Sequence, residues 1–204
     1  MDPSNVGGAR GLSKYRKWPG GIVHYALDSS ADSIWKRRAI FSAMKEWEDK
    51  TCIKFVKRTT QKAYIEFFVG KGCYSYVGRT GGKQPISLGF GCGFHGIAVH
   101  EIGHALGFWH EQSRPDRDNY VEIVWDNIKE DQKHNFRKYS HGSIDSLGVP
   151  YDYGSIMHYG KRDFAKLPWQ VTIRSKNGAS IGQRKHLSPM DVKQMNLFYE
   201  CKKK

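Results

Sequence analysis

One segment in the middle of the chain, HEIGHALGFWH at residues 100–110, restricts the fold more than any other part of the sequence. Its apolar pattern predicts a helix on which His100 and His104 lie one turn apart on the same side, so both imidazoles can reach one metal ion. On a continuous helix His110 would lie ~15 Å along the axis from His100, far beyond the ~2 Å of a zinc–nitrogen bond. If all three histidines bind one ion, the helix must end between them. Gly107 is the residue that tolerates the left-handed backbone needed to turn the chain back.

Glu101 indicates the kind of metal site that these histidines form. It lies ~100° around the helix from His100, beside the metal rather than on it, where a general base belongs. A structural zinc site is normally four-coordinate and closed, without a neighbouring carboxylate. Three neutral imidazoles instead leave the zinc an open position for water, whose pKa the metal lowers and whose proton Glu101 can accept. Each of the histidines taken alone would be interpreted as a packed or surface residue.

The length and composition fit one soluble globular domain, or two small lobes that share a cleft. The chain has 204 residues, of which 39% are hydrophobic and 26% charged, enough to bury a substantial core. No apolar run approaches the ~18 residues of a membrane span. The first residues, Met1–Asn5, lack the basic and apolar regions of a signal peptide, but a mature secreted domain with an added start codon would look the same.

The chain is strongly basic, with 33 Lys and Arg against 20 Asp and Glu and a formal net charge of +13. One interpretation is a solvated basic surface that maintains solubility, and the other is attraction to acidic substrates or matrix polyanions. Nucleic-acid binding is disfavoured, because the basic residues are scattered and only residues 36–38 and 201–204 form short clusters.

Four cysteines, Cys52, Cys73, Cys92 and Cys201, are spread along the chain without a C-x-x-C pair. This spacing disfavours a thiolate zinc site or a thioredoxin-like motif. The even number suggests two disulfides and an oxidising compartment. Four cysteines allow three pairings, and spacing alone cannot choose between them.

The remaining sequence predicts an α+β architecture, with strands and two helices first and an irregular half that ends in a helix. Asp32 or Ser33 can cap the first helix, and the sequence SPMD at residues 188–191 opens the last one. Pro85 cannot donate to a sheet ladder, which favours an edge strand at residues 84–88. Strands are predicted at 22–26, 53–57, 64–69 and 84–88, and helices at about 33–50, 96–106 and 188–199.

Several motifs together resemble the astacins, a family of the metzincin clan of zinc peptidases. The metal-binding segment continues as HEQSRPDRD at residues 110–118, and SIMHY at residues 155–159 resembles the methionine turn of that clan. The similarity extends from about Trp18 to Cys201. Its further motifs are WEDKTC at 47–52, GCYSYVGR at 72–79, YDYG at 151–154 and IGQR at 181–184.

The resemblance implies a two-lobed, metzincin-like zinc protease domain with one zinc ion per chain. The N-terminal lobe, about residues 9–107, would hold a twisted mixed sheet and two helices, and the irregular C-terminal lobe, about 108–204, would end in a helix. Residues 1–8 would be an extension added for expression or a propeptide remnant, since the family is made as zymogens. Tolloid-like members tend to carry extra cysteines beside the position of Cys73, and this chain lacks them. The subfamily therefore stays open among tolloid-like, hatching-enzyme-like and digestive types.

The resemblance also assigns roles to residues outside the first motif. Met157 would form the floor beneath the zinc histidines, and Tyr159 would be a further zinc ligand that swings away to stabilise the tetrahedral intermediate. Without the resemblance, Tyr159 would be a core or rim aromatic and Met157 a core gap-filler. His158 is expected to pack rather than to bind metal. Glu111 would face the freed N-terminus of the mature enzyme, or else need water or another residue as its partner.

The cysteine pattern of the family implies disulfides Cys52–Cys201 and Cys73–Cys92. The first would join the early helix to the C-terminus, and the second would close a loop on the rim of the cleft. Closing such loops is worth a few kcal/mol in chain-entropy terms.

The expected function is that of a secreted, extracellular, monomeric endopeptidase acting on extended protein segments. A substrate would add as an antiparallel strand to the edge near residues 84–88. Many astacins favour an acidic residue after the scissile bond, and the candidate partners here are Arg184 and, more loosely, Lys176. Two alternatives remain open. In one, Arg184 is a structural residue that binds loop carbonyls, and in the other, the chain is a non-catalytic secreted module that binds polyanions.

Overall fold

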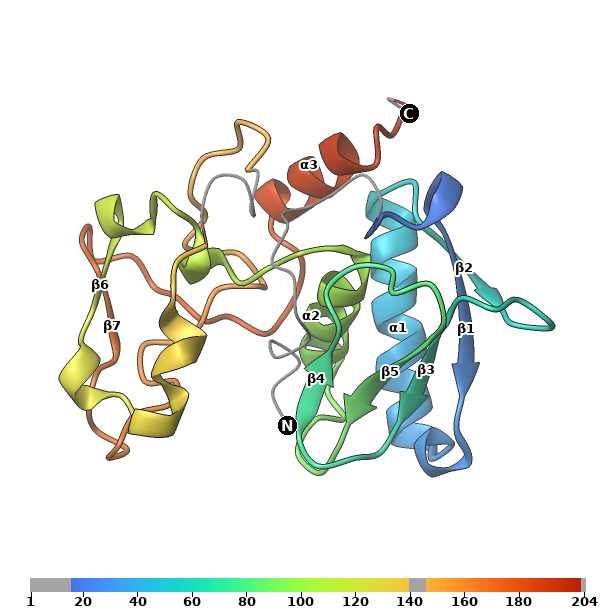
Figure 1. The fold of residues 1–204 in the computed structure, drawn as a ribbon, viewed down its shortest axis with the longest axis horizontal. Coiled ribbons are helices and arrows are strands. Elements are labelled where there is room, and N and C mark those ends of the chain that lie inside the picture. Colours follow the sequence, from blue (N-terminus) through green and yellow to red (C-terminus); the bar gives the residue numbers. More distant parts are fainter. Residues whose placement is uncertain (1–15, 140–145, 203–204) are drawn as a thin grey trace.

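The computed structural model describes residues 16–139 and 146–202, so the extension expected at residues 1–8 lies outside the described residues. The fold class is confirmed as α+β. A mixed sheet with the helices α1 and α2 occupies one side of the molecule, and a second, mostly irregular half lies beside it (Figure 1). The chain passes from the first half to the second directly after α2. The metal-binding segment therefore spans the junction.

The large sheet has five strands in the order β2-β1-β3-β5-β4. All neighbouring pairs are parallel except β4 and β5, which are antiparallel. The strands alternate buried and more exposed positions, most clearly in β3, as expected for a sheet with one covered face. Their bounds are β1 Ile22–Leu27, β2 Lys54–Lys57, β3 Tyr64–Phe68, β4 Cys73–Ser75 and β5 Lys83–Leu88.

The prediction of an edge strand at residues 84–88 is wrong, because β5 lies between β3 and β4. The short strand β4, hidden in a glycine-rich stretch, pairs only with Ile86, Ser87 and Leu88. Pro85 therefore lies beyond the end of β4. Its lack of an N–H removes no hydrogen bond between β5 and β4. The edge on this side of the sheet is β4.

Two helices form the core with the sheet. The first, α1 (Ile34–Lys50), is capped by Ser33, whose side chain accepts the Lys36 N–H. Trp47 of α1 is fully buried and donates its indole N–H to the carbonyl of Val99 in α2 (His95–Leu106) over 3.2 Å. Apolar residues at helical spacing on both helices bury a shared core with the sheet. Among them are Ile40, Met44, Ile65, Phe67, Ile102 and Leu106.

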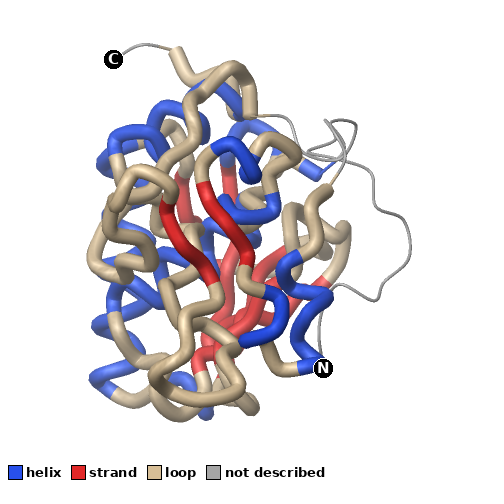
Figure 2. Tube along the Cα trace, turned by 90° about the vertical axis from the view of Figure 1, so that its left-hand side faces the viewer, coloured by secondary structure: helices blue, strands red, loops and turns tan. Residues whose placement is uncertain are grey.

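The second half contains short elements that the sequence did not predict. Strands β6 (Val121–Ile123) and β7 (Ile173–Ser175) form a two-stranded antiparallel sheet, seen among loops and single helical turns in Figure 2. The last helix, α3 (Pro189–Phe198), begins with a complete capping box, as predicted. Four 3₁₀ segments lie near β6, at Glu111–Ser113, Arg117–Asn119, Trp125–Asn127 and Glu130–Phe136.

Both expected disulfides are present, and no described cysteine is free. Cys52–Cys201 joins the residue after the cap of α1 to the segment that follows α3. Cys73–Cys92 joins the start of β4 to the loop before α2. Within the described chain, none of the helices has the length and apolar character needed to cross a membrane.

Candidate metal centre

Three imidazoles converge at the junction of the two halves. The Nε2 atom of His110 lies 3.1 Å from that of His104 and 3.3 Å from that of His100. The Nδ1 atoms of His100 and His104 face backbone carbonyls, those of Ile156 at 2.8 Å and Phe108 at 2.7 Å. These two rings therefore carry their proton on Nδ1 and direct an Nε2 lone pair into the centre.

The geometry of these rings fits a zinc ion. Nitrogens bound tetrahedrally at ~2.0–2.1 Å from zinc would lie ~3.3 Å apart, close to the separations found here. Without a cation, the lone pairs of His100 and His104 would face each other with nothing to bridge them. His110 could donate to at most one of them. Among the described residues, this is the group of metal-binding side chains whose ligand atoms lie close enough for one ion.

The end of α2 brings His110 back to the other two histidines. Gly107 has φ +120°, and its N–H donates to the carbonyls of Gly103 and His104. The next N–H, that of Phe108, also bonds to the Gly103 carbonyl at 2.9 Å. A side chain at residue 107 would be strained in this conformation. The break predicted at Gly107 is thus where the chain turns.

Burial keeps the three imidazoles neutral. Desolvation lowers the pKa of His104 to about 4 and that of His100 and His110 well below the usual value, and the positive charge of Arg184 acts in the same direction. Neutral imidazoles are the form that binds zinc.

Glu101 directly follows His100 in α2 and is only 5% exposed. Its Oε2 atom has no hydrogen-bond partner in the described protein. Burial raises the pKa of Glu101 to about 8, while the positive charge of Arg184 opposes that rise. A buried, unpaired carboxylate oxygen is costly unless something else completes it. This oxygen is therefore available to a water or substrate group at the centre.

Met157 packs against Gly103, the residue before His104 in α2. Met157 is buried, and its sulfur lies 3.0 Å from where a Cβ on Gly103 would stand. Glycine at position 103 therefore permits the methionine turn to approach α2. The sequence does show a glycine inside a helix, but nothing local identifies its neighbour.

Tyr159 lies against the centre within an aromatic group. Its ring centroid is 4.4 Å from that of His110, 5.4 Å from Phe164 and 5.5 Å from Phe136.

The adjacent His158 has its partners elsewhere. Its Nε2 contacts the Tyr151 hydroxyl and its Nδ1 the Tyr159 carbonyl, both at 2.7 Å. Both ring nitrogens of His158 are thus occupied away from the metal centre, as a packing role requires.

Glu111, immediately after the third histidine, is buried but has partners within the protein. Its Oε1 atom accepts the Asp152 N–H at 2.9 Å and Nη1 of Arg114 at 3.2 Å. Burial raises the pKa of Glu111 to about 8, and the charge of Arg114 acts against that rise. The expected partner of Glu111 was the freed N-terminus, water or another residue. Among the described residues, Arg114 and the backbone of Asp152 take that place.

Of the two cationic candidates, only Arg184 lies near the centre. Its charge acts on all three histidines and on Glu101, whereas Lys176 binds the Asp118 carbonyl beside β6 and β7. Arg184 donates through Nη1 to the carbonyls of His158 at 2.9 Å and Gln183 at 2.8 Å. Bonds to loop carbonyls are what we expected if Arg184 were a structural residue.

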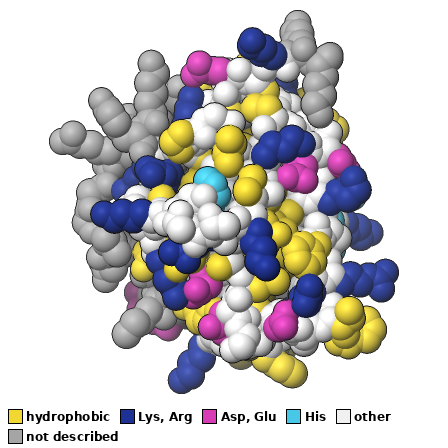
Figure 3. All heavy atoms as spheres, turned by 90° about the vertical axis from the view of Figure 1, so that its right-hand side faces the viewer, with side chains coloured by type: hydrophobic (Ala, Val, Ile, Leu, Met, Phe, Trp, Pro, Cys, Tyr) yellow, Lys and Arg dark blue, Asp and Glu magenta, His cyan; other side chains and the backbone are white. Residues whose placement is uncertain are grey.

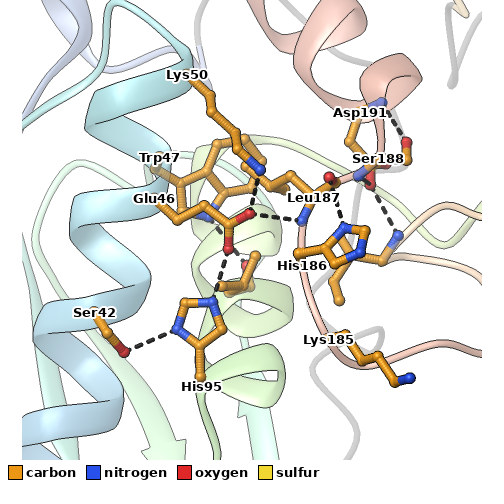
Figure 4. Close-up of polar contacts among 12 residues, drawn as sticks. Ser42, Glu46, Trp47, Lys50, His95, Lys185, His186, Leu187, Ser188 and Asp191 are labelled. Carbon is orange, nitrogen blue, oxygen red and sulfur yellow. Dashed lines mark hydrogen bonds and ion pairs between the residues drawn. The ribbon is translucent and has the colours of Figure 1, made fainter.

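Close packing fixes the backbone of the Arg184 loop. A Cβ on Gly96, in the first turn of α2, would lie 1.8 Å from the Arg184 carbonyl oxygen, so glycine is required there. Gly182 has φ +84°, and a Cβ there would lie 2.2 Å from Gly160. Glu46 also secures this loop, accepting the Leu187 N–H at 3.0 Å and facing His95 at 2.8 Å (Figure 4). Nothing in the sequence indicated that Gly96 and Glu46 contact this loop, and Gly182 stood out only as part of the motif at residues 181–184.

Comparison with known proteins agrees with this geometry. The sequence profile of the peptidase family described as Astacin matches residues 11–200. Zinc metalloproteinase nas-15 of Caenorhabditis elegans is 45% identical over 190 residues, which are 93% of this chain and 33% of that protein. Human Tolloid-like protein 1 is 45% identical over 194 residues, 91% of this chain and 19% of its own length. The chain thus spans a third or less of these two relatives.

A solved structure shares the whole described fold. High choriolytic enzyme 1, a hatching enzyme zinc-protease from the medaka fish Oryzias latipes, is 40% identical. It superposes with a TM-score of 0.85, covering 91% of this chain and 94% of that one. Myroilysin, at 24% identity and a TM-score of 0.64, shares the fold.

Proposed function

This chain belongs to the astacin family of zinc metallopeptidases, and on that premise we propose that it hydrolyses peptide bonds in extracellular proteins with Glu101 as the general base. Two observations carry the proposal: three imidazoles converge, and the residue that directly follows His100, Glu101, has a buried Oε2 without a partner among the described residues. A structural zinc site does not require such an oxygen, because protein ligands fill all four of its coordination positions.

The residues around the centre have distinct parts in this reaction. His100, His104 and His110 would hold the zinc ion, which would supply Lewis-acid chemistry that acidifies water and polarises a carbonyl. Glu101 accepts the proton of the attacking water and passes it to the departing amine. The Tyr159 hydroxyl, whose ring lies against His110, would donate to the developing oxyanion, and by the family resemblance it would also help to hold the zinc ion. Met157 supports the histidines from below.

We propose that the substrate binds as an antiparallel strand along β4, the edge strand beside α2, rather than along β5. Along a sheet edge, backbone hydrogen bonds hold an extended peptide with little regard to its sequence. Any preference for particular substrate side chains must therefore come from pockets in the enzyme.

An acidic residue after the scissile bond is the preference we propose, with Arg184 as its partner. In the part of the chain that the structure describes, the hydrogen bonds of Arg184 use Nη1, so Nη2 and Nε remain to face a carboxylate. A guanidinium in a partly desolvated site holds a carboxylate bidentately. The structural and the specificity roles of Arg184 are therefore compatible. Lys176 is the less suitable candidate, because its ammonium is already bound to the Asp118 carbonyl.

We further propose a secreted, monomeric peptidase domain at residues 9–204, with lobes at about 9–107 and 108–204, that is made as a zymogen. Two disulfides, one closing a separation of 149 residues, support an oxidising compartment. A polyanion-binding role has less support. On the face shown in Figure 3, Lys and Arg side chains are spread among acidic and apolar ones rather than gathered in one patch.

A cleavage assay tests the central proposal. The purified chain should contain one zinc ion, and it should degrade casein or gelatin. 1,10-Phenanthroline should abolish the cleavage, and added zinc should restore it. A chain with a full zinc content that cleaves neither protein would favour the non-catalytic alternative.

A further inference from the structure

Asp191 is a carboxylate at the start of α3 that is buried more deeply than a helix cap requires. It occupies the third position of α3, is 3% exposed, and forms no ion pair within the described residues. Its Oδ2 atom accepts the Ser188 N–H at 2.9 Å, which completes the capping box. Such caps work at exposed helix ends, where the carboxylate keeps its hydration. The burial of Asp191 therefore calls for a second set of contacts.

These contacts go to the methionine turn. The same Oδ2 atom accepts the Ile156 N–H at 2.9 Å, and Oδ1 accepts the Ser155 hydroxyl at 2.6 Å. The Ser155 oxygen in turn accepts the Met157 N–H at 3.0 Å. Asp191 thus ties three successive residues of the turn to the start of α3. Figure 4 shows Asp191 beside Ser188, where the loop enters that helix.

The turn held by Asp191 supplies the acceptor for a metal ligand. The Ile156 carbonyl accepts the Nδ1–H of His100 at 2.8 Å. Ile156 is therefore held at both ends: its N–H binds Asp191 and its C=O binds His100. Acceptors of this kind fix which ring nitrogen is free and where it points.

His104 provides an internal comparison. Its Nδ1–H donates to the Phe108 carbonyl, four residues away, and the N–H of Phe108 is bonded to the end of α2 itself. The geometry of His104 is thus built into its own helix. The acceptor of His100 is 56 residues away on an irregular turn, so another group must hold it in place.

From this arrangement we infer that Asp191 is a positioning residue for zinc: it holds the Ile156 carbonyl, and through that carbonyl it aims the Nε2 atom of His100. The helix cap is its second task. Asp191 touches neither the metal nor the substrate, and its contribution is measurable as zinc affinity, whether or not the chain is a peptidase.

Two variants on the same capping box separate the tasks. Asp191→Ala removes the carboxylate half of the capping box, which accepts the Ser188 N–H, together with the contacts to the turn. Ser188→Ala removes the hydroxyl that accepts the Asp191 N–H but leaves the bond from Ile156 to Asp191 in place. The probe is zinc alone, with its affinity measured by competition against a chromophoric chelator and its release followed in excess chelator. The melting temperature of each metal-free protein reports the loss of the cap.

The expected result is a 10- to 100-fold weaker zinc affinity for Asp191→Ala, the range for groups that orient a metal-binding histidine. Ser188→Ala should lower the melting temperature yet bind zinc within about threefold of the parent protein. Asp191→Asn should restore most of the affinity, because its carbonyl oxygen can still accept the Ile156 N–H.

Two outcomes would overturn the inference. Equal losses of affinity in Asp191→Ala and Ser188→Ala would mean that only helix stability matters, and unchanged affinity in Asp191→Ala would mean that Ile156 needs no support. Should Asp191→Ala not fold, Asp191→Ser replaces it under the same expectation, because its side chain is one bond too short to reach Ile156.

Discussion

The two halves of the molecule supply their shares of the metal centre in different ways. The first half presents His100, Glu101 and His104 on a regular helix, whose backbone is fixed by its own hydrogen bonds and by the hydrophobic core. The second half supplies His110 and brings Tyr159 against it, both from irregular chain. The same centre is thus assembled from a helix with a self-supporting backbone and from turns whose backbone needs other groups to hold it.

Polar side chains replace regular backbone bonding in the second half. Arg117 is 4% exposed and donates through Nη1 to the carbonyls of Gln112 and Phe136. Arg114 and Asp191 bond in a similar way to the carbonyl of Val149 and the N–H of Ile156. Each of these side chains serves backbone groups that a helix or sheet would otherwise satisfy. The first half should therefore be sensitive to cavities, and the second to the loss of single polar groups.

The largest expected effect concerns the chemistry that the helix positions. Glu101→Gln should reduce kcat by several orders of magnitude, because the amide cannot accept a proton from water. The geometry of α2 should persist, so the zinc content should stay at one per chain. Peptide turnover and metal analysis on the same preparation test both parts. A variant that keeps its zinc and most of its activity would remove Glu101 from the role of base.

The next effect tests the hydrophobic half. Trp47→Ala should lower the free energy of unfolding by about 3–5 kcal/mol, because it leaves a large cavity between α1 and α2. Trp35, on the same helix, is 72% exposed, and its replacement by alanine should change stability by less than about 0.5 kcal/mol. Chemical denaturation of the two variants measures the difference. Similar losses in both would contradict the idea that the core determines stability here.

A polar counterpart tests the irregular half. Arg117→Met keeps the aliphatic part of the side chain but leaves the carbonyls of Gln112 and Phe136 without their donor, at a cost of about 2–4 kcal/mol. Arg174, in an exposed ion pair with Glu122, is the control, and Arg174→Met should cost under about 1 kcal/mol. Chemical denaturation of the two variants measures their free energies of unfolding. If Arg117→Met were as harmless as its control, the second half would not depend on its buried polar groups.

The same contrast explains what could be predicted from the sequence. The helices α1, α2 and α3 and the break at Gly107 follow from local patterns: periodicity, caps and glycine. The strands β4, β6 and β7 have three residues each, too few for alternation to stand out.

Partners distant in sequence were beyond such reasoning. Nothing near Asp191 indicates Ile156, and nothing near Gly96 indicates the carbonyl of Arg184. The disulfide pairing likewise came from the resemblance rather than from spacing. The edge-strand prediction failed for a related reason, since whether Pro85 lies at an edge depends on where β4 ends.

A smaller effect is expected at the tyrosine of the irregular half. Tyr159→Phe should reduce kcat about 10²-fold with little change in KM, the usual result of losing one oxyanion donor. Tyr153→Phe is the matched control in the same half, because its hydroxyl bonds to the Tyr120 carbonyl instead. Steady-state kinetics on one peptide compare the two. Native kcat in Tyr159→Phe would show that the hydroxyl does not act in the transition state.

The smallest expected effect concerns specificity, at the residue where the two halves meet. Arg184 is held by the Gly96 contact on one side and by the His158 carbonyl on the other. We expect a preference for Asp or Glu after the cleaved bond, measured as kcat/KM on paired peptides. Arg184→Ala should weaken it by ~1–3 kcal/mol, the range for a charge-assisted hydrogen bond.

Salt separates this contact from the general attraction of a chain with net charge +13. Long-range attraction acts mainly on the association rate and fades at ~0.5 M salt, where the Debye length is only a few ångströms. A direct contact to Arg184 should survive that salt concentration. If Lys176→Ala removes the preference and Arg184→Ala does not, the pocket lies near the β6–β7 sheet instead. If neither variant changes it, the acidic preference does not depend on a cationic pocket, and Arg184 is a structural residue that joins the two halves.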